Sequence, residues 1–516
     1  GKRMKKTGIL LAVLAAAILL KTQVWDRLTR PSAAENNLDR AYSITEIQAA
    51  ADDLYSGFGL LPEDFDWEAA CRESYYQAAE AGSEYDYYLE LCRLTAQLQD
   101  GHTTVIPPKG SDLLGNLPLA LCHIEGEYYV RETLDAEELP LLSRLTKVNG
   151  SDVHAYFQGH VAPYVGVQTP DTQEERWANF LCTQGERGSE VTLEFELPDG
   201  TEKELTYTYK ELGLFDMGGH ESQLVLQYGE EQLYDSDAFG LYRLESGTPT
   251  EESILVVQVK TLTADPTAFR EEYEQEILSR LSGVKGCILD FRTSGGGNSL
   301  NGMTVLAPFV PDETIRTVGG GSSLYQLQDS RLMTLAWFQS MDSDTLYRLG
   351  LDGQTLQNMR ELYSDEVFDT GSQMLEGRYC VEESAFSALL ELDEGDYPFQ
   401  GLPKCSAPVT VLFSHFSGSA VDTTADYANA WGLTTIGTHT AGATGNLMVV
   451  PLCTGYAVTF SGSRQIASDG TDIQNNGVQP RIEVPVSLEA FRTGRDACLE
   501  RAAEELEQMT SGALAE

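Results

Sequence analysis

A buried strand, a small-residue turn and an amphipathic helix follow one another in the most regular hydrophobic pattern of the chain. Residues 409–413 are apolar except for Thr410, which is typical of a strand covered on both faces. The turn at residues 417–420 has the sequence Ser-Gly-Ser-Ala. Four apolar residues then recur at helical spacing: Val421, Ala425, Ala428 and Trp431. The pattern predicts a strand–turn–helix unit with a serine at the start of the helix.

A serine in that position allows two interpretations. Ser and Gly before a helix commonly serve only as an N-cap, which satisfies free backbone N–H groups. The same N–H groups and the positive end of the helix dipole also favour negative charge beside the serine. A serine nucleophile needs such surroundings for the oxyanion it generates. Ser419 is therefore a candidate nucleophile, with Ser417 as its competitor and a simple cap as the alternative.

A second strand and a glycine-rich turn lie at residues 287–298, CILDFRTSGGGN. The apolar start of this segment predicts a short buried strand, and the glycines at 295–297 then allow a sharp turn with bare N–H groups. A dinucleotide-binding loop is excluded because Leu300 stands where its third glycine belongs. The loop is either a structural turn or a donor of backbone hydrogen bonds.

A histidine marks the third segment, residues 98–105, LQDGHTTV. It follows a predicted helix at residues 84–98, whose apolar face combines Tyr88, Leu91, Leu94 and Leu98. Imidazole can exchange a proton near neutral pH, so His102 is a candidate general base. The alternative is a hydrogen-bonded loop histidine without a catalytic role.

Together these segments resemble the tail-specific (C-terminal processing) serine peptidases and their relatives, which include the tricorn core protease. The resemblance rests on a DGHT turn, an LDxRxxGGG strand and turn, an S-A-x-E turn and a closing G-V-x-P-D-I pattern. In this chain the four motifs stand in the family's order, at residues 100–103, 289–297, 419–422 and 477–482. Asp422 stands in place of the family's glutamate, and Arg481 in place of its aspartate.

The resemblance implies that Ser419 is the nucleophile and His102 its general base. It also implies an oxyanion hole formed by the N–H of Ala420 and one N–H of the glycine turn, from Gly295 or Gly296, with Gly297 next in line. A serine peptidase of this kind needs no cofactor and no metal ion.

Two differences from the family's motifs indicate which of its branches the chain resembles more. The tail-specific branch uses a lysine base, and Ala443 occupies that position here, so a Ser–Lys dyad from that loop is excluded. The tricorn-like branch uses a histidine base with an assisting glutamate. That glutamate falls near Gln474, with Asp472 as the neighbouring acid, so either side chain is a candidate to orient His102.

The predicted function is that of an extracytoplasmic serine endopeptidase that cleaves peptide or protein substrates. Two alternatives stay open. The missing helper glutamate and dyad lysine are compatible with a catalytically inactive, peptide-binding scaffold of the same fold. A serine esterase could use the same nucleophile, although the G-x-S-x-G elbow typical of such enzymes is absent.

Charge and cysteine content exclude several partners. The formal net charge of −44 repels phosphate backbones, so nucleic-acid binding is not expected. The nine cysteines contain no C-x-x-C pair, and metal-ligand spacing is absent.

The first 30 residues are basic, unlike the rest of the chain, with seven Lys or Arg and one acid. An apolar run at residues 7–20 behind these basic residues predicts an export segment, either an uncleaved membrane anchor or a cleaved signal.

The expected fold class is α/β, in several parts. Residues 1–35 are a signal or anchor with a linker, and the only expected membrane contact. Residues 36–110 form a helical subdomain and residues 111–212 a β-rich module, with a hairpin at 191–209. Residues 250–490 alternate strand and helix as an α/β core, with an acidic insertion at about 314–400, before a C-terminal helix or tail at 491–516. The resemblance implies a crotonase-like core and a PDZ-like module, and the oligomeric state stays open.

Overall fold

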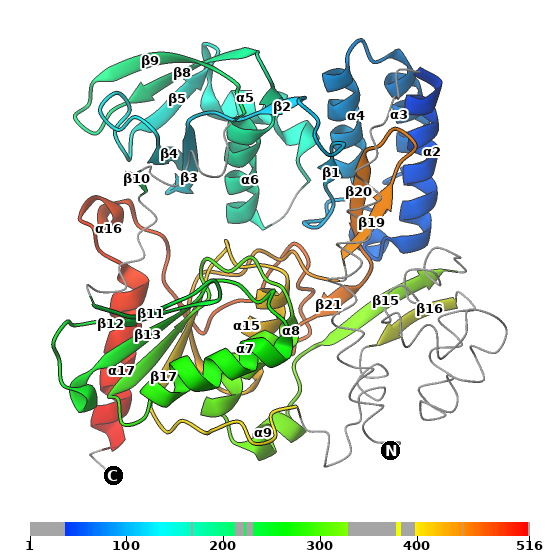
Figure 1. Cartoon of the computed structure of the whole chain (residues 1–516). Helices are drawn as coiled ribbons and strands as arrows, with labels where there is room; N and C mark the ends of the chain where they lie inside the picture. The colour runs from blue at the N-terminus through cyan, green and yellow to red at the C-terminus, as the bar shows by residue number, and fades with distance from the viewer. Residues whose placement is uncertain are drawn as a thin grey trace.

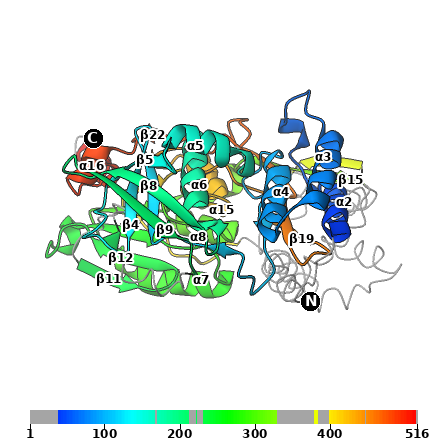
Figure 2. The same ribbon diagram turned by 90° about the horizontal axis from the view of Figure 1, so that it is seen from above.

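The computed structural model describes residues 37–166, 169–211, 221–222, 231–328, 378–382, 398–445 and 447–513. The expected export segment at residues 1–35 and most of the expected acidic insertion lie outside these ranges. Figure 1 shows three parts: a helical part, a β-rich part and an α/β part below both. The helical part lies to one side of the other two in the perpendicular view as well (Figure 2).

The helical part consists of three helices: α2 (Asn37–Leu54), α3 (Trp67–Glu80) and α4 (Glu84–Ala96). Asp66 and Ser83 cap α3 and α4, because their side chains accept hydrogen bonds from N–H groups of the first turn. The predicted apolar face of residues 84–98 is confirmed, since its four members are all buried: Tyr88, Leu91, Leu94 and Leu98.

A hairpin from the far end of the chain completes this core. The hairpin strands are β19 (Leu447–Pro451) and β20 (Ala457–Ser461), and β20 also pairs with β1 (Val105–Ile106). Buried residues of the hairpin share one apolar cluster with α2, α3 and α4. The helical part therefore packs against a segment that follows the candidate serine in the sequence.

A seven-stranded antiparallel sheet forms the β-rich part. Its strands are β3 (Leu119–Ile124), β4 (Glu127–Thr133), β5 (Arg144–Val148), β6 (Ser151–Asp152), β8 (Glu190–Glu196), β9 (Glu202–Thr208) and β10 (Glu221–Ser222). The predicted hairpin at residues 191–209 is confirmed by the pairing of β8 with β9. Helices α5 (Val153–His160) and α6 (Pro170–Thr183) pack on this sheet through one apolar cluster. The short strands β2 (Leu114–Gly115) and β7 (Gly185–Glu186) pair separately.

The α/β part is built on another seven-stranded sheet, in the order β11-β12-β13-β14-β17-β18-β22. Its strands are β11 (Glu231–Asp235), β12 (Phe239–Arg243), β13 (Ile254–Val259), β14 (Gly286–Asp290), β17 (Val409–Phe413), β18 (Thr434–Gly437) and β22 (Ile482–Glu483). The five strands from β13 to β22 are parallel, and β11 and β12 form an antiparallel edge. The strand predicted at residues 409–413 is β17, and every one of its residues is buried.

Helices cover both faces of this sheet, which explains why its central strands are largely apolar. One face packs against α7 (Pro266–Glu272), α8 (Ser299–Leu306) and α15 (Ala420–Ala430). The other face packs against the C-terminal helix α17 (Ala497–Ala513). The helix predicted behind the serine turn is α15, with its four apolar positions buried. The remaining α-helices and strands are α9 (Asp312–Thr317), β15 (Ser322–Gln328), β16 (Arg378–Glu382), β21 (Arg464–Ile466) and α16 (Leu488–Arg492).

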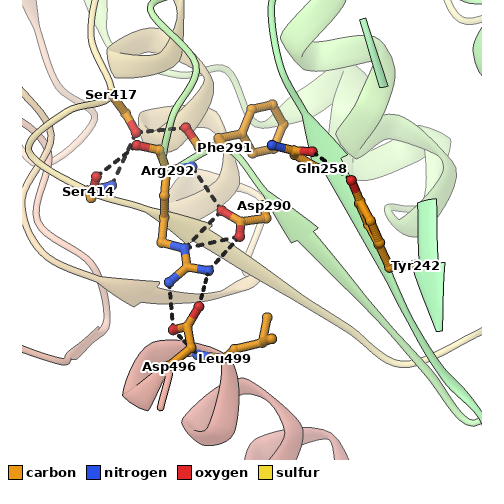
Figure 3. A network of polar contacts seen from close by, with 9 residues as sticks. All are labelled: Tyr242, Gln258, Asp290, Phe291, Arg292, Ser414, Ser417, Asp496 and Leu499. Atoms are coloured by element: carbon orange, nitrogen blue, oxygen red, sulfur yellow. Dashed lines mark hydrogen bonds and ion pairs between the residues drawn. The ribbon is translucent and has the colours of Figure 1, made fainter. Parts of the chain in front are cut away.

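A buried ion-pair network joins α17 to the end of β14 (Figure 3). The Arg292 guanidinium lies between two carboxylates, with Nη2 2.7 Å from Asp290 Oδ2 and Nη1 2.8 Å from Asp496 Oδ1. Asp496 also accepts a hydrogen bond from the Leu499 N–H, so it caps α17 as well. The first turn of the C-terminal helix is thereby fixed to Arg292, two residues after the end of β14.

Two serine hydroxyls join the end of β14 to the end of β17 (Figure 3). Ser414 Oγ donates to the Arg292 carbonyl at 2.9 Å, and Ser417 Oγ donates to the Phe291 carbonyl at 2.8 Å. Ser417 is fully buried. Its hydroxyl therefore has a structural partner, and the turns after the two strands lie next to each other.

The substitution Asp496→Asn should destabilise the protein by about 3 kcal/mol, because it removes one partner of a buried guanidinium. Denaturant unfolding measures this loss. The matched control is Arg495→Ala at the adjacent position, whose ion pair with Glu500 is exposed, so the midpoint should change little. Equal effects of the two substitutions would contradict a structural role for the Arg292 network.

Candidate active site

Ser419 occupies a strained backbone position between Ser417, whose hydroxyl binds the Phe291 carbonyl, and the start of α15. Its φ of 56° and ψ of −120° lie in a region that glycine adopts easily and other residues adopt at a cost. Its side chain makes no capping hydrogen bond to the helix. The N–H of Ser419 donates instead to the Ala443 carbonyl at 2.6 Å. The simple N-cap interpretation of this serine is therefore wrong.

Two other non-glycine residues with positive φ lie near the loop that binds the Ser419 N–H. Six non-glycine residues with positive φ occur in the described ranges: Gln99, Glu125, Leu142, Asn149, Ser419 and Asn475. Two of the others contact each other near Ser419, because Asn475 Nδ2 donates to the Gln99 carbonyl at 2.9 Å and the Asn475 N–H donates to the Gly442 carbonyl. Strained residues persist where the surrounding structure holds them, and such places are often functional.

The glycine turn contacts the serine through Gly296. A Cβ atom at this position would lie 2.7 Å from Ser419 Cβ and 3.0 Å from the Ala420 nitrogen, and φ is +107°. Only glycine fits such a close approach. A Cβ atom at Gly295 would meet nothing within 4 Å. The N–H groups of Gly296 and Ala420 donate to no residue of the described ranges, so both are available beside the serine.

The loop at residues 440–444 holds the serine turn from the opposite side. Asp422, in the first turn of α15, accepts hydrogen bonds from the Thr440 hydroxyl and from the Gly442 N–H, the latter at 3.0 Å. Asp422 is fully buried, and burial raises its pKa to about 7. This loop also carries the Ala443 carbonyl that binds the Ser419 N–H.

The turn that carries His102 is anchored to the same loop through Asp100 and Ser461. Ser461 Oγ lies 2.8 Å from Asp100 Oδ1 and 3.1 Å from the Thr444 carbonyl. The Asp100 carboxylate is buried and accepts four further hydrogen bonds, from the Ser461 N–H, the Thr103 hydroxyl, the His102 N–H and the Gln474 amide. The β20 strand therefore brings the histidine turn, 317 positions before the serine, to the serine's own supporting loop.

His102 has a buried ring nitrogen, Nδ1, with no partner in the described part of the chain. Burial lowers its pKa below 6.5; the charge of Asp100 opposes this effect and that of Arg176 adds to it. No hydrogen bond joins the ring to Ser419 Oγ among the described residues. The neutral ring expected near pH 7 is the form that accepts a proton.

The two candidates for orienting His102 differ in their contacts. Gln474 is buried, and its Nε2 lies 3.3 Å from Tyr55 Oη and 3.5 Å from Asp100 Oδ1. Its Oε1 is buried without a partner among the described residues. Asp472 is instead paired with Arg464. Gln474 is therefore the candidate that shares a neighbour with His102.

Helix α6 of the β-rich part docks on the loops around the serine. Thr172 Oγ1 donates to the His415 carbonyl at 3.0 Å, and Asp171 Oδ2 lies 2.9 Å from His439 Nε2. Arg176, one turn further along α6, is close enough to His102 to affect its pKa. Sequence reasoning missed Arg176 because no motif includes it; only the spacing of four residues from Thr172 indicates that it faces the same side.

Within the described ranges, no group of three or more His, Cys, Asp or Glu side chains could hold a metal ion. The helices of those ranges also include none that is long and apolar enough to cross a bilayer. The expected anchor segment falls on residues that are not described.

Residues 253–484 match the family model described as Peptidase family S41. Among solved structures, mature CPAF complexed with lactacystin aligns with a TM-score of 0.64 at 14% identity, over 92% of this chain and 98% of that chain. Mature CPAF alone aligns with a TM-score of 0.63 at 17% identity, over 92% and 96% of the two chains. No curated protein sequence matches the chain. These similarities support the mixed α/β fold, whereas the crotonase-like and PDZ-like descriptions stay predictions.

The strain at residue 419 leads to a stability prediction. Ser419→Gly should raise the melting temperature above that of Ser419→Ala, because only glycine adopts this backbone conformation without strain. Strain of this kind costs about 1–3 kcal/mol, and the flexibility of glycine in the unfolded chain offsets up to about 1 kcal/mol of the gain. Differential scanning calorimetry measures the difference. A glycine variant that melts below the alanine variant would show that the position is unstrained.

The raised pKa of Asp422 makes stability depend on pH. The folded protein binds this proton more tightly than the unfolded chain, whose carboxyl titrates near 3.8. The contribution of Asp422 to stability therefore falls as the pH rises from about 4 to about 7, by an amount on the order of 4 kcal/mol. Asp422→Asn removes this titration, so its stability relative to wild type should increase across that window in urea unfolding. A constant difference between the two proteins would contradict the raised pKa.

Proposed function

Because residues 253–484 carry a peptidase family S41 domain, we propose that the chain is a serine endopeptidase with Ser419 as its nucleophile. Family membership supports serine peptidase activity, and the endopeptidase type and the residue roles are the proposal. One observation carries it: Ser419 is held in a strained conformation at the start of α15, against Gly296 and beside the unpartnered N–H of Ala420. Free N–H groups beside a partly exposed serine suit the oxyanion of acyl transfer, and backbone strain is common at functional sites.

In the proposed mechanism, Ser419 Oγ attacks the carbonyl carbon of the scissile peptide bond. His102 takes the serine proton as general base and later gives it to the leaving amine. A water molecule then hydrolyses the acyl-enzyme by the same route. The partial burial of the site keeps His102 neutral before the attack, because burial lowers its pKa.

The N–H groups of Ala420 and Gly296 are proposed to form the oxyanion hole. Gly296 packs against Ser419, Ala420 follows Ser419 in the chain, and neither N–H has a hydrogen-bond acceptor in the described chain. A donor of this type is worth about 2.7–4 kcal/mol in the transition state. Gly295 takes no direct part in this proposal, because a Cβ atom there would not meet the serine turn, whereas one at Gly296 would.

Gln474 is proposed to hold His102 in the productive tautomer. Its unpartnered Oε1 can accept a hydrogen bond from Nδ1–H of His102, which also lacks a partner within the described residues. An amide fixes the ring but does not stabilise an imidazolium as a carboxylate does. A glutamate at this position would place a second negative charge beside Asp100. The Gln474 amide instead donates a hydrogen bond to Asp100 Oδ1 at 3.5 Å. The negative charge needed opposite the imidazolium is thus supplied by Asp100, which raises the pKa of His102.

The absence of a hydrogen bond between His102 and Ser419 favours a second candidate, the inactive peptide-binding scaffold. Catalytic hydrogen bonds often tighten only when substrate is bound, and the two residues belong to different parts of the fold. Closure of these parts over a peptide is therefore part of the proposal. The proposed substrates are peptides or unfolded proteins outside the cytoplasm, where the expected export segment at residues 7–20 would deliver the chain.

Hydrolysis of fluorescein-labelled casein tests the proposal. Ser419→Ala should abolish turnover, and His102→Gln should lower it by orders of magnitude. The base must be deprotonated, so wild-type kcat/KM should be lost as the pH falls through a single ionisation below pH 6.5. Melting temperatures of both variants control for folding. Wild-type protein without hydrolysis, or His102→Gln with full turnover, would favour the scaffold or another base.

A further inference from the structure

Arg176 is a partly buried cation without a protein partner in the described part of the chain. Its Nη1 atom is buried and lacks a hydrogen-bond acceptor, and no ion pair to this residue forms within the described ranges. Burial lowers the pKa of Arg176, and the charge of Asp100 opposes this effect. An unpaired guanidinium in such surroundings is unfavourable, because removing an ion from water without a partner costs free energy. Buried arginines are normally paired, as Arg292 is here.

The position of Arg176 on α6 directs it to the proposed active site. Thr172 and Arg176 are four residues apart and therefore lie on the same side of the helix. Thr172 contacts the His415 carbonyl, four residues before Ser419 in the sequence. The charge of Arg176 also lowers the pKa of His102, as expected for a guanidinium near that ring.

Asp100, the carboxylate whose charge acts on Arg176, is already engaged by other donors. Both oxygens of Asp100 already accept hydrogen bonds, from Ser461, Thr103 and the His102 N–H. The acids on α6 are engaged elsewhere, with Glu174 bound to the Tyr128 hydroxyl and Glu175 to the His123 N–H. The guanidinium thus retains donors for an anion that the described protein does not supply.

We propose that Arg176 binds a carboxylate of the substrate peptide and gives the Ser419 site a preference for a negative charge near the scissile bond. The inference rests on the proposed function and adds a substrate class to it. Arginine suits this role because its planar fork matches a carboxylate. The carboxylate belongs to an acidic side chain or to the free C-terminus of the peptide. Its binding would also offset the positive charge beside His102 and so favour protonation of the ring during the attack.

Matched peptides test the proposal on the wild-type protein. Quenched fluorescent peptides are taken from casein segments that the enzyme cleaves, and each is made with Glu or Gln near the scissile bond and with a free or amidated C-terminus. Removal of the recognised carboxylate should lower kcat/KM about tenfold to a hundredfold, as expected for a charge-assisted hydrogen-bond pair. The substitution that has this effect identifies the source of the carboxylate. Equal cleavage of all versions would overturn the proposal.

Arg176→Gln, with Arg187→Gln as the matched control, tests the residue itself. Arg187 belongs to the same β-rich part, and its ion pair with Glu211 is exposed. The Arg176 variant should lose the preference between charged and uncharged peptides, and the control should keep it. A preference that persists in Arg176→Gln, or a uniform loss on all peptides, would overturn the assignment.

Labelling by an uncharged fluorophosphonate separates this inference from the proposed function. The reagent reports on Ser419 and His102 without any substrate carboxylate. A wild-type protein that is labelled and hydrolyses peptides but shows no charge preference refutes the role of Arg176 alone. A wild-type protein that is neither labelled nor active refutes the proposed function.

Discussion

The cross-connection between the ends of β14 and β17 is the constraint on which the rest of the site depends. Ser414 and Ser417 donate their hydroxyls to the carbonyls of Arg292 and Phe291, and the Arg292 side chain is fixed between Asp290 and Asp496. Neighbouring parallel strands end at the same edge of a sheet, but their turns need a further restraint to keep a fixed separation. These bonds provide it, and Gly296 consequently packs directly against Ser419.

Much of the fold around this edge could be predicted from local patterns. The uniformly apolar residues 409–413 form β17, and the helical spacing behind the serine turn corresponds to α15. The family resemblance drawn from four motifs is confirmed by the match over residues 253–484. Periodicity was sufficient here because strand and helix each bury a continuous apolar surface.

The site itself could be predicted only in part. Ser417 and Ser419 are equivalent in a sequence motif, and the partner of Ser417 lies on another strand. The pKa of Asp422 depends on complete burial by a loop about 20 residues away. Arg176 belongs to no motif, and its unpaired state follows from how α6 docks on the α/β part. Each of these properties arises from tertiary contacts, which a local pattern does not encode.

The central claim is that Ser419, rather than Ser417, is the activated nucleophile of this chain. The most direct measurement is mass-spectrometric mapping of the adduct formed by a fluorophosphonate with the wild-type protein. The account predicts a single adduct on Ser419 that forms much more slowly in His102→Gln at unchanged melting temperature. An adduct on Ser417, or labelling of Ser419 at the same rate in both proteins, would contradict it.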